Sequence, residues 1–437
     1  MPGRLRSLLD RALALFARVL VGTFFRDVEV LGKERIPRGV PLLLIANHVN
    51  SLIDPILVMG YLGVRPRILA KSTLWRHPVM APLLLLAGAV PVYRRQDDAD
   101  VSRNLDTFSR CRQTLADGAA VLLFPEGRSH NHPHQLPLKT GAARIALDTE
   151  QRFPGRGLAV VPVGLTYEDK EHFGSRVLVF VGDPVPVAPY AETYARHGRT
   201  AVRELTARMS DELGAVTISH RTWEEARLVE RAAALLEDQA PLSRRFSLRA
   251  QVMRERDVLL RADPERARAL ERAVTAYDRS LAALGLVEAD LEPPAPASPS
   301  GARGWKLVLM APALLGVLLN WLPFKAPGWL AGHISRTADE PATYKLLASL
   351  LTFPLFWSLE VAAAAALGGP WWALAAAVAA PATGYAALVV FARGRPRGRS
   401  AHLMEHERLL AELRSLRARL RDALVDATRP SGTPSGG

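Results

Sequence analysis

Residues 41–55 read PLLLIANHVNSLIDP, and this stretch decides the fold class of the chain. The apolar run over residues 41–46 predicts a buried strand. A polar loop follows it, and the Asp54-Pro55 pair then predicts a helix that begins close to the proline. His48 lies in that loop, just beyond the carboxyl end of the strand, where open α/β sheets usually place their ligands.

The same alternation of strand and helix extends in both directions along the chain, from about residue 28 to residue 187. Further strands are expected at 67–70, 89–93, 121–124, 159–163 and 176–181. Helices are expected at 55–62, 79–86, 102–117 and 140–150. This alternation predicts an α/β domain over residues 27–220, with a mixed, largely parallel sheet flanked by helices.

Residues 1–26 have the pattern of an amphipathic helix. Apolar residues recur at helical spacing from Leu5 to Leu20, and Arg4, Arg11 and Arg18 lie seven apart on another stripe. A basic amphipathic helix can lie in a membrane interface, with its arginines near anionic head groups. A helix of the α/β core has the same pattern, so both interpretations stand.

The second half of the chain changes in composition. Residues 221–288 are charged and helical, and residues 289–303 form a linker rich in proline and serine. Residues 304–392 form the membrane region, with C-terminal transmembrane helices expected at about 307–324, 346–367 and 371–391, where charges are almost absent. Glu360 is the one charge between residues 346 and 391; it marks either a functional carboxylate or the edge of a shorter span.

Residues 393–437 comprise a basic stretch, a short coiled-coil-like helix and a tail expected to be disordered. The basic stretch contains Arg393, Arg395, Arg397 and Arg399, which by the positive-inside rule predicts that this end is cytoplasmic. A cytoplasmic catalytic domain then requires an even number of crossings. The last two segments would form a hairpin, and 307–324 would be re-entrant or interfacial. The leucine seam within 403–424 can form a homodimer or pack on its own chain.

Composition narrows the class of partner. A formal net charge of +13 and a sequence pI near 10.3 favour an anionic partner, and the apolar segments favour a membrane over nucleic acid. No aromatic-rich basic patch or nucleic-acid recognition motif is present, so no nucleic-acid partner is expected. Cys111 is the sole cysteine, which excludes an intrachain disulfide.

His48 is suited to act as a general base, and a carboxylate on its other ring nitrogen would fix the tautomer. Asp54 lies six residues further on, about 240° round a continuous helix. The two side chains can therefore meet only if His48 lies in the loop and Asp54 at the start of the helix. Asp54 can also be a helix N-cap, and a carboxylate with two oxygens can serve both ends.

Three later motifs accompany this pair. The strand at 88–93 leads into Arg94 and Arg95, which indicates either phosphate binding or surface charge. Residues 122–129 read LLFPEGRS, a strand that opens into a loop with Glu126, Gly127 and Arg128. Lys139 stands at a helix start, which favours an anion, and residues 160–164 read VVPVG, an apolar strand beside the site. A metal site at His130, His132 and His134 is disfavoured against a solvated loop, and no metal is expected.

These four blocks, in this order, resemble the phospholipid/glycerol acyltransferase family of glycerolphosphate and lysophosphatidate acyltransferases, over about residues 25–220. The resemblance implies that His48 is the base and Asp54 its orienting partner. It implies that Asn47, Arg94, Glu126, Gly127, Arg128 and Lys139 bind the acyl acceptor. Five residues separate His48 from Asp54 where four are usual, and Glu-Gly-Arg-Ser stands where Glu-Gly-Thr-Arg is commoner. Both departures resemble the glycerol-3-phosphate and dihydroxyacetone-phosphate acyltransferase branch.

The resemblance implies an integral membrane enzyme with its catalytic domain on the cytoplasmic face. It would use acyl-CoA as co-substrate and no cofactor, acylating glycerol 3-phosphate or dihydroxyacetone phosphate, with membrane lipids as further partners. One alternative acceptor is 1-acylglycerol 3-phosphate or another lysolipid. An alternative of another class is a non-catalytic lipid-binding protein with a degenerate site.

Overall fold

The computed structural model describes residues 3–76, 80–93, 102, 104–237, 240–286, 288–291, 301–335, 341–392 and 407–428. The chain divides into two compact units. The first comprises Met1–Ser219 and Leu322–Leu359, and the second comprises His220–Trp321 and Glu360–Gly437. Each unit is described by itself.

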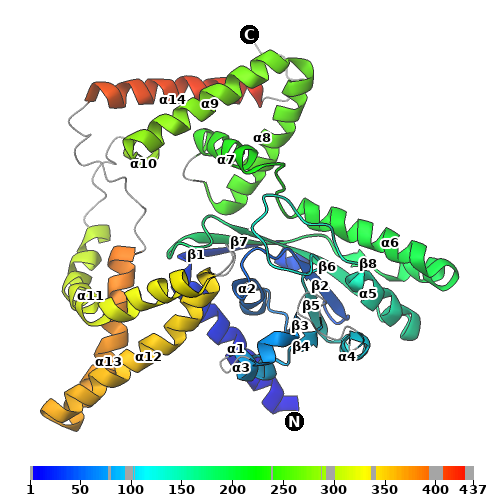
Figure 1. Cartoon of the computed structure of the whole chain (residues 1–437), viewed down its shortest axis with the longest axis horizontal. Coiled ribbons are helices and arrows are strands. Elements are labelled where there is room, and N and C mark those ends of the chain that lie inside the picture. The colour runs from blue at the N-terminus through cyan, green and yellow to red at the C-terminus, as the bar shows by residue number, and fades with distance from the viewer. Residues whose placement is uncertain are drawn as a thin grey trace. The chain divides into compact units, whose positions relative to one another are not determined.

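Eight strands in the described part of the first unit form one mixed sheet (Figure 1). They are β1 Asp27–Leu31, β2 Leu42–Ala46, β3 Pro66–Lys71, β4 Val90–Val92, β5 Ala120–Leu123, β6 Ala159–Tyr167, β7 Arg176–Val181 and β8 Val185–Pro186. The order is β1-β7-β6-β2-β5-β3-β4, with β8 paired to β6. All pairs are parallel except β6–β7 and β6–β8. The predicted fold class is therefore confirmed.

Helices cover both faces of this sheet, as the alternation of side chains along β2 requires. Leu42, Leu44 and Ala46 pack in the core with α1 Gly3–Phe24 and α2 Ile53–Tyr61. Leu43 and Ile45 point to the other face, into the core beneath α4 Asn104–Ala116, α5 Gly141–Arg152 and α6 Ala191–Ala215. The remaining short helices of this unit are η1 Lys33–Arg35, η2 Ser72–Arg76, α3 Met80–Ala87 and η5 Ala188–Tyr190.

Helix α1 combines features of both interpretations of residues 1–26. Ala17, Val21 and Phe24 are buried, and the helix packs along α2. Leu15 and Val19 remain about 60% exposed on another stripe of the same helix. One face of α1 therefore belongs to the core, while a second apolar stripe is left outside it.

Three of the described helices are long and apolar enough to cross a membrane. The first two lie within α11 Gly301–Ile334 and α12 Pro341–Gly368. The third, Pro370–Phe391, comprises α13 Pro370–Ala387 and most of η6 Leu388–Ala392. The expected break between the last two spans occurs at Gly369, whose φ of +79° favours glycine, with Pro370 at the first helical position. The first span is longer than the expected 307–324, because the helix continues through Pro323 to Ile334. Most of the 289–303 linker, the basic stretch and the 429–437 tail lie outside the described residues.

The second unit contains a helical bundle of α7 Trp223–Leu236, α8 Leu242–Ala262, α9 Pro264–Leu284, α10 Glu288–Leu291 and α14 Glu407–Ala427. Glu288 is buried between Arg231 and Arg417, and it accepts a hydrogen bond from Tyr277 Oη at 3.0 Å. Leu413 and Leu420 of the leucine seam are buried in the core of this bundle. The seam therefore packs on its own chain, one of the two predicted alternatives, and a homodimer through 403–424 stays a prediction.

Candidate active site

The site lies at the edge of the sheet where β2 and β5 end. These strands are parallel neighbours, with Ile45 opposite Leu123, so the loops that follow them meet at one edge. His48 comes from the first loop, and Phe124 begins the second. Their rings stack with centroids 3.9 Å apart and planes 15° from parallel, which fixes one face of the imidazole.

His48 and Asp54 form the predicted pair. The Nδ1 atom of His48 lies 2.8 Å from Oδ2 of Asp54, whose side chain is fully buried. An ionised carboxylate can only accept, so Nδ1 is the protonated ring nitrogen and Nε2 has the free lone pair. No described residue bonds Nε2, and His48 lines a cavity. The loop position of His48 agrees with the geometry that the six-residue spacing requires.

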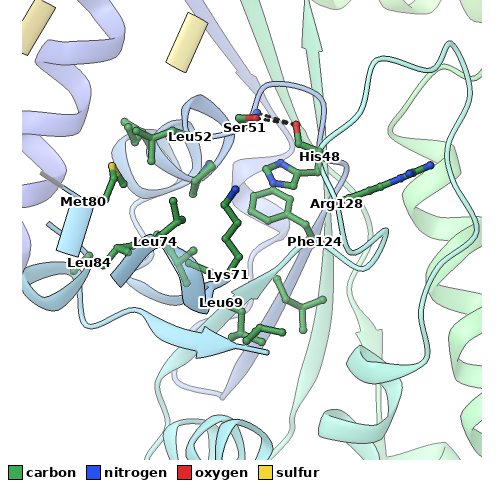
Figure 2. Close-up of a pocket in the computed structure, with 18 of the residues that line it drawn as sticks. His48, Ser51, Leu52, Leu69, Lys71, Leu74, Met80, Leu84, Phe124 and Arg128 are labelled. Carbon is green, nitrogen blue, oxygen red and sulfur yellow. Dashed lines mark hydrogen bonds between the residues drawn. The ribbon is translucent and has the colours of Figure 1, made fainter. Parts of the chain in front are cut away.

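The expected capping role of Asp54 is wrong. Helix α2 begins at Ile53, so Asp54 lies within the first turn, and its Oδ2 accepts from the N–H groups of Val49 and Asn50, at 2.9 and 2.8 Å. The carboxylate therefore binds the loop before the helix. Ser51 lets the loop fold back by adopting a φ of +33°, and its N–H donates to Oγ of Ser129 at 3.1 Å (Figure 2).

Tyr167 completes the environment of Asp54 and was missed from the sequence. Its hydroxyl donates to Oδ1 of Asp54 at 2.6 Å. Burial, reinforced by the neighbouring carboxylate, raises the pKa of Tyr167 well above its usual value, so the phenol stays a donor at neutral pH. Tyr167 ends β6, a parallel neighbour of β2, and the only signal was a polar side chain beyond the predicted end of that strand.

Asn47 and Glu126 hold the loop at His48 in place. Asn47 exchanges two hydrogen bonds with the backbone of Leu165, at 3.0 and 2.7 Å. Glu126 Oε2 accepts from the N–H of His48 at 3.1 Å and lies 2.8 Å from Nε2 of His130. Neither Asn47 nor Glu126 is among the described residues that line the cavity, and a direct role in acceptor binding stays a prediction.

The cavity beside His48 has a volume of about 1310 Å³. It is lined mainly by apolar side chains, with cationic ones at Lys71, Arg128, Lys139 and Arg144 and polar ones that include His48 and Ser51. Figure 2 shows the Lys71 side chain extending toward His48 and Phe124, whereas Arg128 extends away from the imidazole. Lys71, the last residue of β3, was missed, although a lysine where a parallel strand ends was a usable signal.

Gly127 and Lys139 pack directly against each other. Gly127 has a φ of +77°, and a Cβ built on it would lie 2.5 Å from Nζ of Lys139. The Lys139 backbone N–H donates to the Pro125 carbonyl at 2.8 Å, which ties the start of α5 to the same loop. These contacts place the ammonium of Lys139 at the cavity wall. Arg94 lies outside the described residues.

Two other sequence features lie apart from the cavity. His130 is buried against Glu126, and His132 and His134 stack with ring centroids 5.4 Å apart. No group of three or more His, Cys, Asp or Glu side chains in the described part of the chain is arranged to hold a metal ion. In the 160–164 motif, a Cβ on Gly164 would lie 1.8 Å from the Val216 carbonyl oxygen, so that glycine admits the end of α6 against β6.

The site combines a loop histidine held by a buried aspartate with a large, mainly apolar cavity that has cationic residues in its wall. These are the parts that an acyl-transfer site needs. Residues 27–166 match the family model described as Acyltransferase, so the α/β domain is similar to this acyltransferase family.

Three relatives indicate the range of the family that this chain resembles. An uncharacterized acyltransferase of Schizosaccharomyces pombe is 26% identical over 454 residues, covering 78% of this chain and 66% of the relative. Glycerol-3-phosphate O-acyltransferase 2 of Saccharomyces cerevisiae is 32% identical over 188 residues, 42% of this chain and 25% of the relative. A chloroplastic 1-acyl-sn-glycerol-3-phosphate acyltransferase of Brassica napus is 29% identical over 152 residues, 35% of this chain and 40% of the relative. The matches thus span between a quarter and about two thirds of the relatives' own lengths.

Proposed function

We propose that this chain is a membrane-bound acyltransferase that moves a fatty acyl group from acyl-CoA to a hydroxyl of glycerol 3-phosphate or dihydroxyacetone phosphate. The observation that carries the proposal is the arrangement of His48. Its Nδ1 is held by Asp54 at 2.8 Å, and its Nε2 has no described partner beside a cavity of about 1310 Å³.

In the proposed reaction, His48 Nε2 takes the proton of the acceptor hydroxyl as its oxygen attacks the thioester carbonyl. The C–O bond forms and the C–S bond then breaks. The CoA thiolate leaves with the proton that the imidazolium returns, so the products are an ester and a free thiol. Asp54 stabilises the imidazolium in between, and general-base catalysis of this kind contributes roughly 10²–10⁴-fold.

Cations at the cavity support a phosphorylated acceptor. Lys139, Lys71 and Arg128 line the cavity that His48 enters, and lysine and arginine are the usual partners of phosphate oxygens. Arg94 is proposed to join them on the family resemblance. A phosphate held there would place the acceptor hydroxyl near Nε2 and lower the entropic cost of reaction.

The proposed reaction requires no cofactor and no metal. Acyl-CoA is the proposed co-substrate and membrane lipids are the proposed surroundings, since three described helices are long and apolar enough to cross a bilayer. A cytoplasmic catalytic domain is proposed because four arginines follow the last span.

The spacing between His48 and Asp54 and the 32% identity to a glycerol-3-phosphate O-acyltransferase favour a small phosphorylated acceptor. The 29% identity to the plant enzyme favours 1-acylglycerol 3-phosphate as the second candidate.

A radiolabelled acyl-CoA assay of the full chain in lipid nanodiscs tests the proposal. It compares glycerol 3-phosphate, dihydroxyacetone phosphate and lysophosphatidate as acceptors. We expect transfer to one of the first two, and a loss of at least 100-fold in His48→Ala with the protein still folded. Transfer only to lysophosphatidate would select the second candidate. No transfer by the wild-type chain, or near-normal transfer by His48→Ala, would overturn the mechanism.

A further inference from the structure

The wall of the cavity is built in part by the start of helix α12. Thr343, Tyr344, Leu346, Leu347 and Leu350 line it, and all of these except Tyr344 are spaced so that they lie on one face of the helix. Among the described residues, none between 146 and 342 lines the cavity. The start of α12 is therefore far in the sequence from the other residues that line the cavity around His48.

Specific contacts hold this helix start against the loop that follows His48. Thr343 Oγ1 accepts a hydrogen bond from the N–H of Leu52 at 3.1 Å, two residues before Asp54. Lys345 Nζ donates to the Glu171 carbonyl at 3.1 Å. Leu346 is 5% exposed and belongs to the same core as α2 and β2. The position of α12 beside the site is thus set by polar contacts at its first turn and by packing in its second.

The same helix changes surroundings farther along. From Thr343 to Gly368 it is apolar and long enough to cross a membrane. Leu351, Leu355 and Leu359 are each more than half exposed, and none of them lines the cavity. The first turns of α12 therefore line the cavity, and exposed apolar residues begin directly after them.

We propose that the face of α12 formed by Thr343, Leu346, Leu347 and Leu350 is a wall of the acyl-chain site, and that Leu347 and Leu350 limit the length of chain accepted. This inference rests on the proposed function. The thioester carbonyl must lie at His48 Nε2. Binding of the hydrocarbon chain attached to that carbonyl is most favourable where apolar side chains exclude water. In Figure 2 the apolar residues Leu52, Leu74, Met80 and Leu84 lie on the opposite side of His48 from Arg128. The acyl chain and the anionic groups of the substrates can therefore bind on different sides of His48.

Chain-length profiles test the proposal. Leu350→Trp fills cavity volume, and Leu355→Trp makes the same exchange at an exposed position of the helix that does not line the cavity. With saturating glycerol 3-phosphate, kcat/KM is measured for acyl-CoA of 8, 12, 16 and 18 carbons in nanodiscs. We expect Leu350→Trp to lose at least 10-fold for the two longest chains and at most 2-fold for the shortest. Leu355→Trp should keep the wild-type profile. An unchanged profile in Leu350→Trp, or an equal shift in Leu355→Trp, overturns the assignment.

A second measurement separates this inference from the proposed reaction. Acyl-CoA with a photoreactive diazirine at the end of its chain is irradiated with the wild-type protein and with His48→Ala, and the labelled peptides are identified by mass spectrometry. Labelling within residues 343–350 in both proteins supports the chain site even if turnover fails. Labelling restricted to peptides outside those that line the cavity overturns it even if turnover is intact.

Discussion

The backbone N–H of His48 donates to Oε2 of Glu126 at 3.1 Å, so the glutamate of one motif holds the main chain of another. The same oxygen lies 2.8 Å from Nε2 of His130, and the His130 N–H donates to the His48 carbonyl at 3.0 Å. The loops after β2 and β5 are therefore joined through both the backbone N–H and the backbone carbonyl of His48. From this geometry we expect Glu126 and His130 to act as positioning residues.

Glu126→Gln should lower kcat more than it raises the KM for the acceptor. The amide keeps one acceptor oxygen for the His48 N–H, but it loses the negative charge that strengthens the hydrogen bond with His130 Nε2. Hydrogen bonds to charged groups are worth about 1.5–3 kcal/mol. We expect kcat to fall roughly 10- to 100-fold, with acceptor KM changed less than 3-fold. Steady-state kinetics with glycerol 3-phosphate measures both values.

Glu150→Gln is a matched control, because Glu150 is also buried and its Oε1 accepts from the Gly155 N–H at 3.2 Å, on the loop after α5. It should leave kcat within 2-fold. If Glu126→Gln instead raises the acceptor KM at constant kcat, Glu126 contacts the acceptor directly.

Tyr167→Phe should lower both stability and kcat. The buried Oδ1 of Asp54 would lose its donor at 2.6 Å, which costs about 1–3 kcal/mol for an unsatisfied buried acceptor. Because the pKa of Tyr167 is raised in the folded protein, its contribution to stability is complete below the usual tyrosine pKa of about 10 and is lost as pH rises toward the folded value. The difference in thermal midpoint between wild type and variant should therefore be constant from pH 6 to 9 and narrow above pH 10. A difference that grows above pH 10 would contradict this.

The sheet was largely predictable because its inner strands are continuous apolar runs. β2 and β5 are buried along their whole length, and their ends agree with the predicted ones within one residue. β1 was missed because it is an edge strand that includes Asp27 and Glu29, so its pattern is half polar. β8 was missed because two residues give no periodicity.

The site was predictable where its residues lie close together in the sequence. It was not predictable where a contact joins residues that are far apart in the sequence. His48 and Asp54 lie six residues apart, and the loop geometry follows from that spacing. Tyr167 lies 113 residues from Asp54, and Thr343 lies 291 from Leu52. Such contacts depend on the order of strands and on the return of α12, which no local pattern specifies.

Gly127→Ala should impair catalysis beyond its cost in stability. The φ of +77° makes any Cβ unfavourable, and this one would lie 2.5 Å from Nζ of Lys139, so that side chain must leave its place. Gly118→Ala provides the matched control, since Gly118 has the same φ of +77° with nothing within 4 Å of the added Cβ. Both variants should lose about 1 kcal/mol of unfolding free energy. Only Gly127→Ala should raise the KM for glycerol 3-phosphate, by roughly 10-fold.

Equal kinetics in the two glycine variants would show that the position of Lys139 does not matter for the acceptor. Thermal midpoints and KM values from the same preparations decide between these outcomes.

Lys71→Ala tests whether the lysine at the end of β3 serves the acceptor phosphate or the imidazole. Figure 2 shows its side chain extending toward His48, so the geometry allows either role. A phosphate contact predicts that KM for glycerol 3-phosphate rises about 10-fold, equivalent to about 1.4 kcal/mol, while the slow transfer to unphosphorylated glycerol is unchanged. An electrostatic effect on His48 predicts instead a change in kcat with both acceptors, because the general base is common to them. We expect the first result. Lys33→Ala, which removes a lysine bonded to the Tyr61 carbonyl at 2.8 Å and absent from the cavity wall, should change neither value.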